Sequence, residues 1–207
     1  MDTPGQNHYH YIDNYNGSLL LRVLSDLLSP PILAIPVFFA ISLRVASAFS
    51  QVLLIFTICF FFQTLFPVIY LFTALRTGII SNIHLYLKEE RSLVFPTLAV
   101  CYLLGYIVAV SLSLPELISG LMFTSGYLIL LVWLINTQHK ISIHAVGAAG
   151  LLTGLFFVFG PKLFFLELLL ILIWWVRFKS NAHVTSQVLF GILLGHGITY
   201  LLLRFFL

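Results

Sequence analysis

The sequence predicts an all-α protein, a polytopic membrane bundle of about six to seven transmembrane helices preceded by an interfacial amphipathic helix. Of its 207 residues, 60% are hydrophobic and only 8% are charged, and a soluble domain of this length cannot bury so much apolar surface. Apolar runs of about 18 or more residues recur along the chain and are typical of membrane-spanning helices. No segment alternates between apolar and polar residues as a membrane barrel does, so we expect helices throughout.

The N-terminal part divides into a tail and a short helix. Residues 1–17 are polar and rich in Asn, Tyr and His, and we expect no cleavable signal peptide because no basic start precedes an apolar stretch. Residues 18–29 carry polar side chains on one helical face and Leu or Val on the other. This amphipathic segment is too short to span a membrane, so we expect it to lie in the interface. Residues 18–207 then form a single transmembrane domain.

Seven candidate spans follow, each an apolar run bounded by polar or turn residues. They cover about residues 31–48, 51–75, 94–113, 116–136, 143–159, 162–178 and 183–206. In the last span Gly191 and Gly195 are four residues apart, and Gly150 and Gly154 repeat this spacing in the fifth. Small residues at this spacing let membrane helices approach closely, so we expect the last helices to pack tightly.

The order of the spans predicts where the polar loops lie. Loops 76–93, 137–142 and 177–182 follow the second, fourth and sixth spans, so each returns to the side on which the chain began. This side collects most of the cations together with His144 and His183. Such a concentration of positive charge suits an anionic headgroup, and we expect both histidines to converge there with the third loop's arginine.

The third loop has residues suited to phosphate-ester chemistry. If the last helix begins near His183, Gln187 lies one turn later, and its amide oxygen can hold one ring proton. The other ring nitrogen is then free to attack phosphorus. Arg177 supplies a planar set of donors for phosphate oxygens, and the first turn of the helix adds free N–H groups. The alternative is a loop histidine beside cations that only set the membrane orientation.

The second loop repeats the pattern more weakly. Ser142 and the backbone amides near it can bind phosphate oxygens, and Lys140 adds a positive charge to the same loop. His144 can protonate the leaving oxygen as a general acid. The alternative is that Ser142 caps the helix and is followed by an interfacial histidine.

The first loop contains two cations, Lys88 and Arg91, which lie one helical turn apart and could bind a phosphate between them. The alternative is an ordinary basic loop that Glu89 and Glu90 neutralise.

These loops resemble the membrane-bound type 2 phosphatidic acid phosphatase family, which shares its phosphate site with the vanadium haloperoxidases. The third family motif, Ser-Arg-X5-His-X3-Asp, is matched in spacing by Arg177-X5-His183-X3-Gln187. Val176 replaces the serine of that motif, and a glutamine replaces its aspartate. The second motif, Pro-Ser-Gly-His, is matched only at the serine and histidine, which are Ser142 and His144.

The first family motif, Lys-X6-Arg-Pro, has its spacing in His84 and Arg91, with the lysine replaced and Ser92 at the proline position. The resemblance implies His183 as a nucleophile that forms a phosphohistidine, His144 as the acid and Arg177 as a phosphate ligand. It implies hydrolysis of a lipid phosphate or isoprenyl (di)phosphate, without a metal or other cofactor.

Two other functions stay open. The chain could be a catalytically degenerate member of the same fold that binds lipid or serves as a structural subunit of a membrane complex. Gln187 favours this alternative, because an amide stabilises a developing imidazolium less than a carboxylate does. A small transporter is the third class, and it would need charged residues along the bundle interior, where only Glu167 is available. We expect Glu167 to pair with Lys162 or to extend toward the interface.

The expected partners are membrane lipids and the phosphorylated lipid or prenyl substrate, with no nucleic acid. The chain could also form a homo-oligomer or join a membrane complex. We expect an integral protein of the bacterial inner (cytoplasmic) membrane. The excess of cations favours a cytoplasmic position for the loop side, whereas the family's site usually faces away from the cytoplasm.

Overall fold

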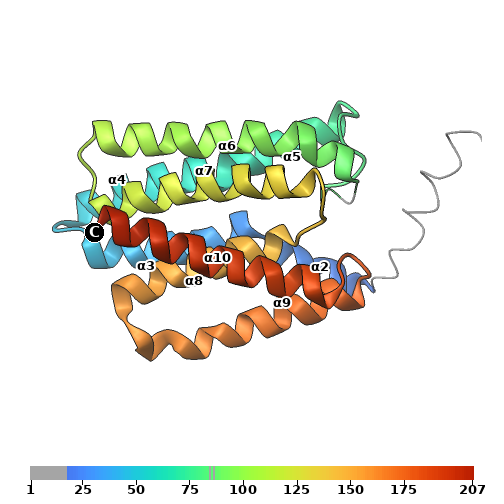
Figure 1. Ribbon diagram of the computed structural model, residues 1–207. Helices are drawn as coiled ribbons and strands as arrows, with labels where there is room; N and C mark the ends of the chain where they lie inside the picture. Colours follow the sequence, from blue (N-terminus) through green and yellow to red (C-terminus); the bar gives the residue numbers. More distant parts are fainter. Residues whose placement is uncertain (1–17, 84, 86) are drawn as a thin grey trace, which may run out of the picture.

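The computed structural model describes residues 18–83, 85 and 87–207, and every regular element in this part of the chain is helical. The predicted polar tail, residues 1–17, lies outside the described residues. The helices form one bundle in which they run side by side (Figure 1). In chain order they are α2 (Leu19–Leu27), α3 (Pro30–Val45), α4 (Phe49–Phe60), the π-helical turn η1 (Phe61–Leu65), α5 (Phe66–Arg76), α6 (Lys88–Ser111), α7 (Glu116–Asn136), α8 (Ile143–Phe159), the 3-10 helix η2 (Pro161–Glu167), α9 (Leu168–Lys179) and α10 (Thr185–Phe206).

Several of these helices are long and apolar enough to cross a membrane. Four segments meet both requirements, namely Phe49–Arg76, Glu89–Ser111, Glu116–Asn136 and Thr185–Phe206. α2 and α3 together form a further segment that is bent by 43°. The predicted class, a bundle of apolar helices typical of an integral membrane protein, is confirmed. The predicted span 143–159 has the bounds of α8, which at 17 residues is shorter than these segments, and the predicted span 162–178 covers η2 and α9 in succession.

The first polar loop is shorter than expected. We predicted a helix from about residue 94, whereas α6 begins at Lys88, so Arg91 lies on the helix. Glu89 and Glu90 occupy the first turn of α6, where carboxylates favour the positive end of a helix dipole. The loop therefore covers residues 77–87.

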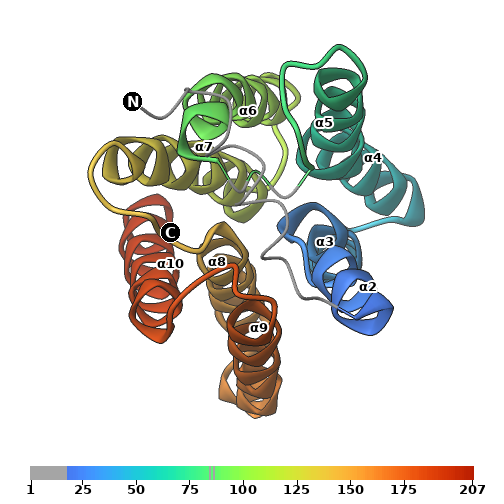
Figure 2. The same cartoon turned by 90° about the vertical axis from the view of Figure 1, so that its right-hand side faces the viewer.

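α8 occupies the middle of the half of the bundle that carries the second and third loops. It contacts α3, α7, α9 and α10, as the end-on view shows (Figure 2). α10 approaches α8 through two glycines: a Cβ atom on Gly191 would lie 2.9 Å from the Ser142 carbonyl oxygen, and one on Gly195 would collide with the Val146 oxygen. The predicted close approach at these glycines is confirmed, and it places the start of α10 against the start of α8.

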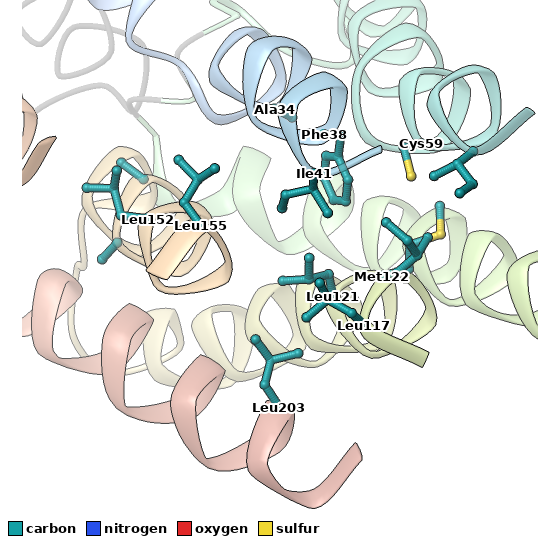
Figure 3. Packing of buried hydrophobic residues seen from close by; sticks show 14 of the residues in the cluster. Ala34, Phe38, Ile41, Cys59, Leu117, Leu121, Met122, Leu152, Leu155 and Leu203 are labelled. Carbon is teal, nitrogen blue, oxygen red and sulfur yellow. The ribbon is translucent and has the colours of Figure 1, made fainter. Parts of the chain in front are cut away.

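A buried apolar cluster holds the helices in register at mid-length. It includes Phe38 and Ile41 from α3, Cys59 from α4, Met122 from α7 and Leu203 from α10 (Figure 3). Because elements from the whole chain meet in this cluster, the loops at the bundle ends are held at fixed positions relative to one another.

The three polar loops lie at one end of the bundle, as the order of the spans predicts. Loops 77–87, 137–142 and 180–184 are together with the start of α2 at the right of Figure 1. The connections at 46–48 and 112–115, the turn at Gly160 and the C-terminus lie at the other end. We call the end of the bundle that carries the three polar loops the loop end.

Candidate functional site

His183 lies in the turn between α9 and α10, and Gln187 follows in the first turn of α10. His183 Nδ1 is 2.9 Å from Gln187 Oε1, and the Val184 N–H donates to the same oxygen at 3.4 Å. A backbone N–H can only donate, so the atom that it approaches is the amide oxygen, and His183 Nδ1 must donate to that oxygen as well. The proton of the neutral ring is therefore on Nδ1, and Nε2 keeps its lone pair.

The surroundings of His183 keep it neutral. Its side chain is only 5% exposed. Burial lowers the pKa of His183 well below its usual value, the positive charges of Arg177, Arg91 and Lys140 lower it further, and the hydrogen bond to Gln187 opposes the shift. The neutral ring is the form that can act as a nucleophile.

Arg177 and His144 both hydrogen-bond to Ser25, a residue of α2. Arg177, in the last turn of α9, donates from Nη1 to Ser25 Oγ at 2.7 Å. His144 Nε2 lies 3.2 Å from the Ser25 carbonyl oxygen. Because a carbonyl oxygen only accepts, Nε2 of His144 carries a proton. One residue of the N-terminal helix thus contacts two of the predicted site residues.

The position of Ser25 shows what part of the polar stripe of the amphipathic segment contacts. We expected this segment to lie in the membrane interface, and within it Ser25 is fully buried against α9 and α8. The exposed face of α2 includes Leu19, Leu20 and Leu27. The only sequence signal for Ser25 was its place in the polar stripe of residues 18–29, and such a stripe fits water as well as a buried arginine. Ser25 faces Arg177 because the arginine is buried, and a buried cation requires hydrogen-bond acceptors.

Arg91 joins two loops at the loop end. Its Nε donates to the Leu85 oxygen at 2.7 Å, and its Nη1 donates to Asn136 Oδ1 at 3.1 Å and to the Ile141 oxygen at 3.3 Å. Nη2 makes no hydrogen bond to any residue that the structure describes. Arg91 thus fixes the geometry of the loops with two nitrogens and has a third left for a ligand.

Ser142 precedes α8 and lies beside Gln187. The backbone carbonyl oxygen of Gln187 accepts from the Ser142 N–H at 3.3 Å. The Ser142 hydroxyl is fully buried, caps no N–H of α8 and has no hydrogen-bond partner among the described residues. The expected alternative, a side-chain cap, is therefore wrong. A buried hydroxyl without a partner costs about 1–3 kcal/mol, so its presence beside His183 and Gln187 marks a position where a ligand oxygen would be stabilised.

Lys140 contributes to the positive potential of the site. The pKa of Lys140 is lowered to about 8, chiefly by burial and also by repulsion from Arg91 and Arg177. These mutual shifts mean that the three cations lie close enough to repel one another. An anion between them would relieve the repulsion.

A cavity opens next to this cluster and extends into the bundle. It has a volume of about 360 Å³. Polar side chains of Asp26, Ser29 and His144 line one part of it, and apolar side chains of α3, α5 and α6, such as Pro31, Leu71 and Phe95, line the rest. A ligand with a polar head and an apolar chain would match this lining.

The structure thus brings most of the predicted site residues to the loop end, on α6, α8, α9, α10 and the loops between them. Lys88 begins α6, but its side chain lies outside the described residues, and so does His84. No group of three or more His, Cys, Asp or Glu side chains that could hold a metal ion occurs in the described part of the chain. No protein-family model, no curated protein and no solved structure matches the chain.

Proposed function

We propose that the chain is an integral membrane phosphatase that acts on a lipid phosphate or an isoprenyl (di)phosphate through His183. The observation that carries this proposal is the hydrogen bond from His183 Nδ1 to Gln187 Oε1, because it leaves the Nε2 lone pair available beside buried cations. The buried Ser142 hydroxyl and the apolar cavity next to His144 support a phosphate group at the loop end with its chain in the bundle.

In the proposed reaction, the Nε2 lone pair of His183 attacks phosphorus and forms a P–N bond while the P–O bond to the lipid breaks. Arg177, Lys140 and the free Nη2 of Arg91 stabilise the charge on the phosphate oxygens. The leaving oxygen takes a proton from an acid, for which His144 is the candidate. Water then cleaves the P–N bond, releases inorganic phosphate and restores the neutral imidazole.

One observation favours the second candidate, a catalytically degenerate protein of the same architecture that binds lipid or supports a complex. His144 Nε2–H donates to the Ser25 carbonyl oxygen, and Arg177 Nη1–H donates to Ser25 Oγ. Donation of the Nε2 proton of His144 to a leaving group would therefore require Ser25 to release it, whereas a binding role would not.

The test is phosphate release by the purified protein from a panel of phosphatidic, lysophosphatidic and isoprenyl phosphates in buffer without divalent metal. We expect His183→Ala to abolish release. His139→Ala is the matched control, since His139 is an exposed histidine of the neighbouring loop, and it should keep wild-type activity. Full activity in His183→Ala would refute the histidine mechanism.

Gln187 separates the two candidates. If Gln187 orients a working His183, Gln187→Asp should keep or raise the rate, because a carboxylate accepts the same bond and also stabilises the imidazolium. Gln187→Leu should slow turnover about 10–1000-fold, which corresponds to about 1–4 kcal/mol of barrier. If the wild type is inactive and Gln187→Asp gains activity, the result supports the second candidate, a catalytically degenerate protein that binds lipid or supports a complex. Wild-type rates in Gln187→Leu would show that His183 is not activated in this way.

A further inference from the structure

A second cluster of polar side chains lies within the bundle, away from the loop end. His196 of α10 has its Nδ1 atom 2.7 Å from Thr153 Oγ1 of α8 and its Nε2 atom 3.3 Å from Glu167 Oε2. We expected Glu167 to pair with Lys162 or to extend toward the interface. Pairing with Lys162 is wrong, because at the change from η2 to α9 the Glu167 carboxylate lies against His196 of α10. The three side chains form one hydrogen-bonded row across three helices.

The positions of the protons in this row follow from which atoms can only accept a hydrogen bond. The Thr153 hydroxyl donates its single hydrogen to the Ala149 oxygen at 2.9 Å. Toward His196 it can then only accept, so Nδ1 must carry a proton. Nε2 faces a carboxylate oxygen, and these two atoms hold a second proton between them. In this arrangement the His196–Glu167 pair is neutral overall.

A small rotation gives an alternative arrangement with one proton fewer. If the Thr153 hydroxyl turns from the Ala149 oxygen to His196 Nδ1, it donates there and Nδ1 needs no proton. Nε2–H then donates to the Glu167 carboxylate, and the pair carries one negative charge. Both arrangements leave every nitrogen and hydroxyl of the row hydrogen-bonded, and they differ by the proton on Nδ1.

The setting makes such a row unusual. His196 belongs to a helix long and apolar enough to span a membrane, yet its side chain is 29% exposed and that of Glu167 is 36% exposed. Ionisable groups at such positions are costly and are retained for function. The other charged or titratable groups on the adjoining elements are Arg44, Glu116, Tyr127, His144, Lys162, Arg177, Lys179, Tyr200 and Arg204. In the described part of the chain, none of them makes a hydrogen bond or ion pair with Glu167 or His196.

We propose that Thr153, His196 and Glu167 form a site within the membrane that binds and releases one proton. Thr153 is the switching element. Its hydroxyl accepts from His196 Nδ1 when the proton is bound there, and it donates to Nδ1 when the proton has left. The pair is partly exposed at the surface of the bundle, so it is not sealed inside the packed core. This proposal does not depend on the phosphatase activity.

The row joins two helices that also reach the loop end. Glu167 lies where α9 begins, and α9 carries Arg177 in its last turn. His196 lies on α10, whose first turn holds Gln187, the partner of His183.

The test is nitrogen-15 NMR of histidine-labelled protein in lipid nanodiscs, since ring nitrogen shifts distinguish the two tautomers and the cation. The His196 signals are assigned by their absence in His196→Gln. As the pH is raised, we expect His196 to change from a ring protonated on Nδ1 to one protonated on Nε2 alone. A single unchanged state throughout the titration overturns the proposal.

Two variants of Thr153 test the switch. Thr153→Ser keeps the hydroxyl and should keep the transition. Thr153→Val removes the oxygen that accepts the Nδ1 proton, and lipid offers no acceptor in its place. This variant should lower the proton affinity of the His196–Glu167 pair about tenfold or more. Glu167→Gln removes the carboxylate and should also lower it by at least about tenfold. Identical transitions in Thr153→Val and Thr153→Ser would show that the hydroxyl takes no part, and the two-state row would be wrong.

Discussion

Replacing Ser25 with alanine removes only the hydroxyl that Arg177 contacts. His144 bonds to the backbone oxygen of residue 25, which alanine retains. The Ser25 and Arg177 side chains are 0% and 1% exposed, so bulk water cannot substitute for the lost oxygen. A hydrogen bond from a charged donor contributes about 1.5–3 kcal/mol. For a chain of this length, that loss lowers the melting temperature by about 3–12 °C.

Thermal unfolding of the purified protein, followed by near-ultraviolet circular dichroism, measures this loss. Ser18→Ala is the matched control, because Ser18 is an exposed serine of the same segment whose Oγ accepts only a long bond of 3.5 Å from the Leu21 N–H. It should lower stability by no more than about 1 kcal/mol. Orthovanadate extends the assay: in Ser25→Ala the Ser25 hydroxyl no longer competes with the oxyanion for Arg177 Nη1, so vanadate should raise the melting temperature more than in wild type.

Equal melting temperatures for Ser25→Ala, Ser18→Ala and wild type would refute this reasoning. Arg177 would then gain nothing from the Ser25 hydroxyl.

Two further predictions concern charge and packing. The pKa of Lys140 is lowered to about 8, chiefly by burial, so Lys140 loses its charge as the pH rises through that value. The affinity of the protein for inorganic phosphate should therefore fall about fivefold by pH 9.5. Lys140→Arg, which stays charged, should remove this dependence in calorimetric titrations. Gly195→Ala should destabilise the protein by about 1–3 kcal/mol, because the new methyl group meets the Val146 oxygen and the helices must separate.

Gly197→Ala is the matched control for the packing prediction. A Cβ atom on Gly197 has no neighbour within 4 Å, and alanine favours a helix by up to about 1 kcal/mol. If both alanine variants were equally stable, close packing at Gly195 would be excluded. An unchanged phosphate affinity from pH 7 to 9.5 would likewise exclude Lys140 from the site.

The sequence could predict the elements whose boundaries have local causes. α7 and α8 begin and end as expected because Pro115, Asn136 and Gly160 interrupt apolar runs. The gathering of the polar loops followed from the order of the spans alone, since a chain that crosses a layer an even number of times returns to its starting side.

Contacts between distant segments could not be predicted. Ser25 and Arg177 are 152 positions apart, and nothing near Ser25 distinguishes a serine that faces arginine from one that faces water. The partner of Glu167 was assigned wrongly for a similar reason. Lys162 is close in sequence, but the chain changes from a 3-10 helix to an α-helix at Glu167, and this change decides where its carboxylate points.

The π-helical turn Phe61–Leu65 has a consequence for the tolerance of this chain to deletions. A π turn holds one residue more than the α-helical register, and each residue of an α-helix advances the angular phase by about 100°. α4, before the turn, packs on α3, while Tyr70, after it, bonds Thr97 of α6 at 3.3 Å. Loss of one residue from the turn would restore a uniform α-helix and leave α5 facing α6, whereas the same loss from within α4 or α5 would rotate the rest of the helix by about 100°. The turn is therefore the place where this long helix best tolerates the deletion of one residue.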